Sequence, residues 1–176
     1  YIRMSEEMRY IELQLEIDEN LEEFSDEEKR NYLRKLYNAS CDFLKEYANH
    51  CVLDVAGHEK VYDIGFWYCD YMAKERQLSE KEFLENFLKY LKDVTKLPVI
   101  MIVGKKIQNE KGISKSYGTS YMLRSLQGFR TRKDIYYYED DVQVTDGGIL
   151  LCKKSLDELI ATIEQNDHIQ IKKKVD

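Results

Sequence analysis

Eight cationic side chains lie between Gly104 and Lys133, against a single acidic one, Glu110. The cations are Lys105, Lys106, Lys111, Lys115, Arg124, Arg130, Arg132 and Lys133. Glycines and hydroxyl residues are interspersed among them, so backbone amides and lysines could meet a phosphate group there. The segment is therefore a candidate anion-binding or nucleic-acid-binding site. It contains neither the P-loop nor the dinucleotide-binding glycine pattern, and the other interpretation is a solvated, lysine-rich loop.

A group of carboxylates follows this basic segment. It consists of Glu139, Asp140, Asp141 and Asp146. These residues could hold a divalent metal ion if the strands bring them together. They do not match the hairpin pattern of metal-dependent nucleases, because Leu151 stands where an acid is expected before Lys153. A nucleotidyltransferase pattern also fails, because Tyr136 stands where a second carboxylate is expected after Asp134. A solvated turn beside a hairpin is the other interpretation.

The cysteines are widely spaced and form no C-x-x-C pair. They are Cys41, Cys51, Cys69 and Cys152. His50 and His58 lie near two of them, but the spacing matches no familiar zinc site. We therefore expect buried, reduced thiols, no cofactor and a cytoplasmic location. A Cys–His nucleophile pair stays open, because such residues meet in space and not along the chain.

Aromatic residues are densest in two stretches, residues 66–68 with Tyr71 and the run Tyr136, Tyr137 and Tyr138. Both stretches are expected to be mostly core. A strand with three consecutive tyrosines must nevertheless direct at least one of them to the opposite face. Because exposed tyrosine is a common anchor at protein interfaces, these three residues are candidates for partner binding.

The elements that would position these groups change character at the only proline, Pro98. Residues 1–98 carry 22 acidic and 14 basic side chains, whereas residues 99–176 carry 11 and 13. Apolar residues follow a helical period before Pro98 and a strand-like period after it. We therefore predict a helical portion over residues 1–97 and an α+β portion over residues 98–176, which could also form one continuous domain.

Capping boxes mark two helix starts before Pro98. Ser25 precedes Glu28 by three residues, and Ser79 precedes Glu82 in the same way. The periodicity of the apolar residues predicts helices at about 6–23, 25–49, 58–76 and 80–95.

After Pro98, short runs rich in apolar residues predict strands, beginning with a buried one at about 99–103. Further strands are expected at about 135–138, 142–145, 149–152 and 169–171. Helices are expected at about 117–127 and 155–165. The fold class predicted is α+β, with about four helices followed by a small mixed β-sheet and two helices.

The net charge of −6 argues against a protein whose whole surface coats nucleic acid. No apolar run approaches the ~18 residues needed to cross a bilayer, so no membrane partner is expected. The function predicted is a cytosolic, non-enzymatic interaction or regulatory protein. It would bind a protein partner, or a second copy of itself, through acidic helices and exposed tyrosines.

The alternative is a nucleic-acid or phosphate-handling protein that uses the basic segment, and it could be an enzyme with a metal ion held by the nearby carboxylates. The arrangement of the cations separates the two functions. Cations gathered on one concave face beside the carboxylates would favour the alternative, and dispersed cations would favour the interaction protein.

Overall fold

The computed structural model describes residues 7–15, 24–47, 53–55, 63–125, 132–145 and 148–151. The strands are β1 (Met8–Leu15), β2 (Leu53–Val55), β3 (Asp63–Cys69), β4 (Val99–Val103), β5 (Ile135–Tyr137), β6 (Val142–Thr145) and β7 (Gly148–Leu151). The helices are α1 (Asp26–Leu44), α2 (Tyr71–Lys74), α3 (Glu80–Thr95), α4 (Ile113–Ser125) and α5 (Tyr138–Asp141). Two short 3-10 helices, η2 (Lys45–Tyr47) and η3 (Glu110–Gly112), complete the described elements.

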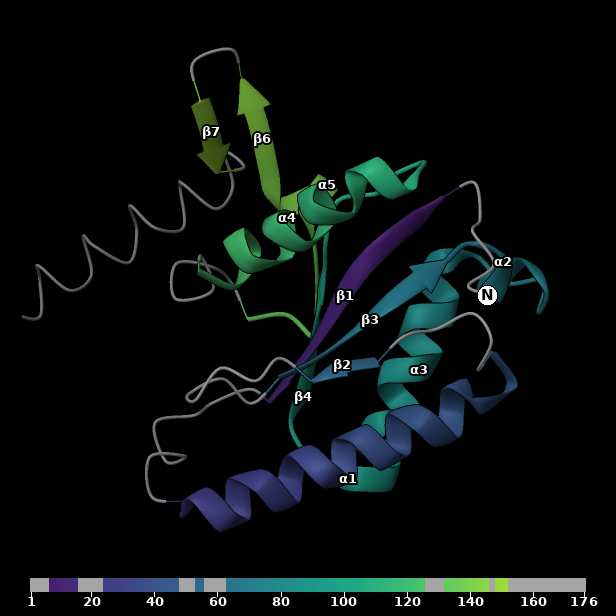
Figure 1. The fold of residues 1–176 in the computed structure, drawn as a ribbon, viewed down its shortest axis with the longest axis vertical. Helices are drawn as coiled ribbons and strands as arrows, with labels where there is room; N and C mark the ends of the chain where they lie inside the picture. The colour runs from purple at the N-terminus through teal and green to yellow at the C-terminus, as the bar shows by residue number, and fades with distance from the viewer. Residues whose placement is uncertain are drawn as a thin grey trace, which may run out of the picture.

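Five strands form the main sheet in the order β2-β3-β1-β4-β5. The central strand β1 pairs antiparallel with β3 and β4, and β4 pairs parallel with β5. Strands β6 and β7 form a separate antiparallel hairpin. Figure 1 shows α1 and α3 on one side of the main sheet and α4 on the other. The protein therefore has an α+β fold in which strands from both sides of Pro98 share one sheet.

The core lies between the sheet and the helices α1 and α3. Ile11 and Leu13 of β1 point to this side and are fully buried. Phe83 and Phe87 of α3 pack there together with Phe66 of β3. The alternation of apolar and polar side chains along β1 explains its conformation, because a strand places every second residue on the same face.

The predicted helices that begin at capping boxes are confirmed. α1 and α3 start directly after Ser25 and Ser79, and in both the serine and the glutamate three residues later form reciprocal hydrogen bonds. This local motif fixes the helix start without help from the rest of the fold, because both partners lie within one turn.

The prediction that residues 1–97 form a helical portion is wrong in one respect. This part of the chain also contains the strands β1, β2 and β3. The helix expected at about 6–23 is a strand over residues 8–15, and the helix expected at about 58–76 contains β3 and the short α2. In β3, Phe66 and Tyr68 are buried on the side of the α1–α3 core, where Phe66 contacts Phe87 and Tyr68 contacts Phe83. Trp67 lies between them on the opposite side, against Tyr10. Three successive aromatic residues can occupy two opposite faces only in a strand.

Beyond Pro98 the predictions agree better with the structure. All five residues of β4 are buried, as expected, and β5, β6 and β7 lie within about one residue of their predicted ranges. The helix predicted at about 117–127 corresponds to α4, which begins earlier, at Ile113. The helix and strand expected at 155–165 and 169–171 lie outside the described residues. None of the helices in the described part of the chain is both long and apolar enough to cross a lipid bilayer.

Of the two described cysteines, Cys69 is buried and Cys41 is half-buried. Cys51 and Cys152 lie outside the described residues, as do His50, His58 and His168. The structure therefore does not test a Cys–His pair.

Candidate interaction site

Helix α4 directs small and polar residues toward the sheet. Ser116, Ser120 and Arg124 follow each other at intervals of four residues, so they lie on one side of the helix. Ser116 is fully buried, where its Oγ accepts a hydrogen bond from the Tyr10 amide at 2.9 Å. The same hydroxyl donates to the Lys105 carbonyl at 2.6 Å. One serine thereby joins α4 to the central strand and to the segment after β4.

Glu12 of β1 is the charged group beneath α4. Its side chain is only 4% exposed, and it accepts hydrogen bonds from the Arg124 guanidinium at 2.7 Å and from the Ser120 hydroxyl at 3.2 Å. A buried carboxylate needs a partner of this kind, because desolvation penalises an isolated charge by several kcal/mol. The row of α4 above Glu12 is therefore polar, whereas Leu123 of the same helix is buried against Ile102 and Tyr138.

Gly104 lies where α4 approaches the sheet most closely. A Cβ atom at this position would stand 2.4 Å from the Ser116 carbonyl oxygen and 2.9 Å from the Tyr10 carbonyl oxygen. Both atoms belong to backbone that cannot easily move. Close packing of α4 thus accounts for this glycine without a phosphate ligand.

Beside this polar row, α4 presents large apolar residues to solvent. Ile113, Tyr117 and Tyr121, which we call the α4 stripe, are 39%, 41% and 54% exposed. They also follow each other at intervals of four residues and so form a continuous row. Tyr117 is held in place by an edge contact with the Tyr10 ring, and the Arg124 guanidinium lies over the Tyr121 ring at 4.8 Å. α4 therefore carries an exposed apolar row directly beside its buried polar row, and Leu123 of the same helix is buried as well.

The predicted basic segment is dispersed over the molecule. Lys111 and Lys115 are exposed near the start of α4, Arg124 is paired with Glu12, and Lys105 lies over the Tyr138 ring. Lys106 binds Glu7 at 3.0 Å, and Lys133 binds Asp141 at 3.0 Å. Arg132 is exposed beside a groove along β5, and Arg130 lies outside the described residues. The described cations do not gather into one anion site.

The carboxylates proposed as metal ligands are also separated. Glu139 binds Arg9, Asp141 is buried against Lys133, and Asp140 is exposed beside the same groove. Asp146 lies outside the described residues. Within the described ranges, no group of three or more His, Cys, Asp or Glu side chains is arranged to hold a metal ion.

Arg9 is the centre of a second buried charge cluster, which the sequence did not indicate. Its guanidinium contacts Glu80 at 3.1 Å and Glu139 at 2.9 Å, and it donates to the Gly104 carbonyl at 3.2 Å. No local pattern connects positions 9, 80 and 139. The cluster joins β1, the start of α3 and α5 where β4 and β5 end.

The two glutamates of this cluster have opposite pKa shifts. Burial raises the pKa of Glu80, although Arg9 and Lys106 oppose the shift. Burial alone would also raise the pKa of Glu139, but the hydrogen bond from the Lys106 amide and the charge of Arg9 outweigh it and lower that pKa. Burial, followed by the negative charge of Glu80, raises the pKa of the nearby Tyr137 hydroxyl to about 12, so this group stays protonated.

These shifts predict opposite effects of pH on two variants. Ionised Glu80 opposes folding because its pKa is higher in the folded protein, so Glu80→Gln should raise the free energy of unfolding at pH 7. That gain should disappear below the ordinary pKa of 4.5, where both states are protonated. Glu139→Gln should lower the free energy of unfolding at pH 7, and this loss should vanish as the pH falls through the lowered pKa of Glu139. Urea unfolding of both variants from pH 7 down to acid pH measures the difference, and the same sign for both variants at pH 7 would contradict it.

The tyrosines proposed as partner anchors differ in exposure. Tyr136 and Tyr138 are 5% and 8% exposed, so the prediction of a tyrosine surface is wrong for these two. Tyr136 accepts a hydrogen bond from the Lys133 amide, and Tyr138 packs with Ile102 and Leu123 beneath α4. Tyr137 alone is half-buried and borders the groove.

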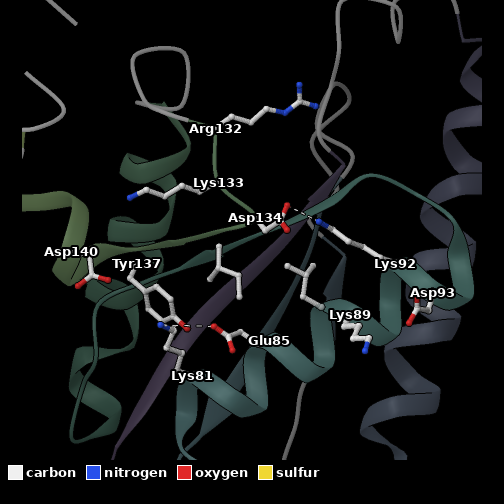
Figure 2. A pocket seen from close by; sticks show the side chains of 12 residues that line it. Lys81, Glu85, Lys89, Lys92, Asp93, Arg132, Lys133, Asp134, Tyr137 and Asp140 are labelled. Carbon is white, nitrogen blue, oxygen red and sulfur yellow. Dashed lines mark hydrogen bonds and ion pairs between the residues drawn. The ribbon is translucent and has the colours of Figure 1, made fainter. Parts of the chain in front are cut away.

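That groove lies between α3 and β5 and has a volume of about 1040 Å³ (Figure 2). Leu88, Ile135 and Tyr137 contribute apolar surface to it. Charged residues of both signs line the rest, and Lys92 and Asp134 join its two walls through an ion pair of 2.6 Å. The groove is therefore mixed in charge.

The two long helices before Pro98, α1 and α3, are not strongly acidic. α1 carries four acidic and four basic side chains, and α3 carries four and three. The predicted acidic surface of these helices is therefore absent from the described part of the chain, and α4 itself carries two basic and no acidic side chains.

No family model, curated protein or solved structure matches this chain.

Proposed function

We propose that this protein is a non-enzymatic interaction protein whose α4 stripe inserts into an apolar groove of a partner protein. The observation that carries this proposal is the α4 stripe itself, three large apolar residues exposed in one row of a helix. Amphipathic helices bind grooves through anchors at such intervals. The free thiol of Cys41 supports a reducing compartment such as the cytoplasm.

The chemistry of the stripe favours a protein partner over nucleic acid. Tyrosine supplies a large contact area at low cost in side-chain entropy and is enriched among the residues that dominate binding energy. The exposed Lys111 and Lys115 at the start of α4 favour a partner with carboxylates on its surface. Dispersal of the other cations, together with the net charge of −6, argues against a long phosphate backbone as the ligand.

The first experiment tests whether a partner contacts the α4 stripe. A photo-crosslinking amino acid is placed at Tyr121 in cells, and a matched control carries it at Val94, which is 56% exposed on α3. A protein adduct formed from Tyr121 and absent from Val94 is expected. A nuclease-sensitive adduct from Tyr121 would favour the nucleic-acid alternative and contradict the proposal.

The second experiment measures affinity for the purified partner. Tyr117→Ala and Tyr121→Ala should each raise Kd at least about tenfold, as expected for anchors that lose about 1.4 kcal/mol or more of binding energy. Val94→Ala should leave Kd unchanged, and the melting temperature of the tyrosine variants shows whether the fold is retained. Unchanged Kd for both tyrosine variants would show that the stripe is not the binding surface.

A further inference from the structure

Another cavity, of about 390 Å³, lies where the end of α1 packs against α3, two helices that cross in Figure 1. Small-molecule sites in proteins have volumes of about 300–1,000 Å³, so the space suits a small ligand. Its walls are formed largely by four aromatic side chains, which are Phe43, Tyr47, Phe83 and Tyr90. Its charged lining consists of two carboxylates, Asp42 and Glu46, and one guanidinium, Arg76. Two negative charges against one positive charge leave the cavity with a net charge of −1.

The wall contributed by α1 and η2 repeats one arrangement. Asp42 directly precedes Phe43, and Glu46 directly precedes Tyr47. All four side chains line the cavity, and the two pairs are four residues apart, which is about one helical turn. The wall therefore consists of two successive pairs, each made of a carboxylate and an aromatic ring.

The second pair holds a cation that belongs to the chain itself. Arg76 forms an ion pair with Glu46, and its Nε donates to the Tyr47 hydroxyl at 3.0 Å. The centre of its guanidinium lies 5.8 Å from the centroid of the Tyr47 ring. A cation at this distance is attracted by the negative face of an aromatic ring. This half of the cavity thus shows that its walls accept an organic cation.

The first pair has the same chemistry without such a partner. Within the described residues, Asp42 is exposed and forms no ion pair. Phe43 and Tyr90 are half-buried, and their ring centroids lie 5.2 Å apart with the planes tilted by 49°. Part of each ring therefore stays uncovered in the half of the cavity that contains Asp42.

The stability of α1 does not explain Asp42. This residue lies in the last turn of the helix, where the helix dipole disfavours a negative charge, and the turn contains no basic residue. Glu46, four residues further along, adds repulsion between like charges. A bound cation would relieve both effects, so the position of Asp42 points to a ligand.

We propose that this cavity binds a quaternary ammonium group against the rings of Phe43 and Tyr90, with Asp42 as its counter-ion. A quaternary ammonium carries no N–H groups, so it leaves no donor unpaired against an aromatic wall. A guanidinium or a primary ammonium would need further acceptors. Those of the other half, Glu46 and the Tyr47 hydroxyl, are already used by Arg76. The single charge of the ligand also matches the net charge of the cavity.

The first test compares choline with its neutral carbon analogue, dimethylbutanol. Choline should bind saturably with a Kd of about 1 mM or tighter, and should shift the amide NMR signals of residues 42–47 and of Asn86. The analogue should bind at least about tenfold more weakly, because attraction to the rings and to Asp42 requires the charge. Absence of saturation by choline at about 20 mM would overturn the proposal, and so would equal binding of the two compounds.

Two substitutions test the proposed contacts. Asp42→Asn and Tyr90→Leu should each raise the Kd for choline about threefold or more. Asp93→Asn is the matched control, because it removes an exposed carboxylate of α3 that lines the groove beside β5, and it should leave the Kd unchanged. Asp42→Asn should not lower the melting temperature, since the charge that it removes is unfavourable for α1. An unchanged Kd for Asp42→Asn would overturn the proposal even if Tyr90→Leu impairs folding.

Arg76→Gln tests the sign of the charge that the cavity prefers. This variant removes the cation of the chain and frees Glu46 and the Tyr47 ring, so it should tighten choline binding about threefold or more. Weaker binding in this variant would mean that Arg76 attracts the ligand, which would make the cavity an anion site and overturn the proposal.

A final comparison identifies the molecule that carries the ammonium group. A short peptide that contains trimethyllysine is titrated alongside choline and alongside the same peptide with unmodified lysine. Tighter binding of the methylated peptide would assign the cavity to a modified side chain, and tighter binding of choline would assign it to a free small molecule. Equal binding of the two peptides would show that methylation is not recognised and would overturn the proposal. None of these measurements involves the α4 stripe, so their outcome is independent of the proposed function.

Discussion

Replacing Arg124 with methionine is expected to lower the free energy of unfolding by about 3–5 kcal/mol. The substitution leaves the carboxylate of Glu12 buried between β1 and α4, with the Ser120 hydroxyl as its remaining partner in the described structure. The penalty arises from this unpaired charge more than from the lost attraction, because the ion pair had already been removed from water. Urea unfolding at pH 7 measures the change.

A second substitution tests this explanation. Glu12→Gln combined with Arg124→Met removes both charges, so the double variant should recover most of the lost free energy. As a control, Lys81→Met breaks an exposed contact with Glu85 of 3.9 Å and should change the free energy by less than about 1 kcal/mol. If the double variant is no more stable than Arg124→Met alone, the unpaired carboxylate is not the cause.

This ion pair also shows why the candidate site could not be predicted from the sequence. Glu12 and Arg124 are 112 residues apart, and no local pattern connects them. The basic segment around Arg124 suggested phosphate binding, whereas the fold uses its charge to neutralise a strand carboxylate. Tyr117 and Tyr121 stay exposed because they lie beside the buried row of α4 and not in it.

The parts of the fold that were predicted correctly depend on neighbours in the chain. Ser25 and Glu28 form a capping box within one turn, and the run 99–103 is apolar throughout, as a central strand requires. β1 was missed because Tyr10 and Leu13 fit a helical spacing, while the alternation of Ile11 and Leu13 with polar residues fits a strand. Residues 8–15 form a strand because they pair with β3 and β4. Since both partners lie far along the chain, the local sequence could not show this pairing.

The same limit applies to Tyr136, Tyr137 and Tyr138. The short apolar run 135–138 indicated a strand, but it could not show which faces the rest of the chain would cover, nor that Tyr138 begins α5. α4 and the segment around Val142 bury Tyr138, while the groove beside α3 leaves Tyr137 half-buried. Whether a side chain is exposed depends on how the helices pack on the sheet. Tyr136 and Tyr138 are therefore buried, whereas Tyr117 and Tyr121 of α4 are exposed.

The second large effect is expected in the core that joins these layers. Phe87 of α3 is fully buried, stacks on Phe43 of α1 at 4.6 Å and meets the edge of Phe66 in β3 at 5.3 Å. Phe87→Ala should therefore lower the free energy of unfolding by about 3–5 kcal/mol, since it removes apolar contacts and leaves a cavity among three elements. Chemical denaturation at neutral pH measures this loss.

Val94 provides the matched control, because it belongs to the same helix but is 56% exposed. Val94→Ala should change the free energy of unfolding by no more than about 0.5 kcal/mol. Phe87→Leu should fall between the two, because leucine refills part of the cavity. A loss below about 1 kcal/mol for Phe87→Ala would mean that α1 and α3 do not enclose this ring against the sheet. Since α3 also forms one wall of the groove beside β5, that result would remove the structural basis for the groove as well.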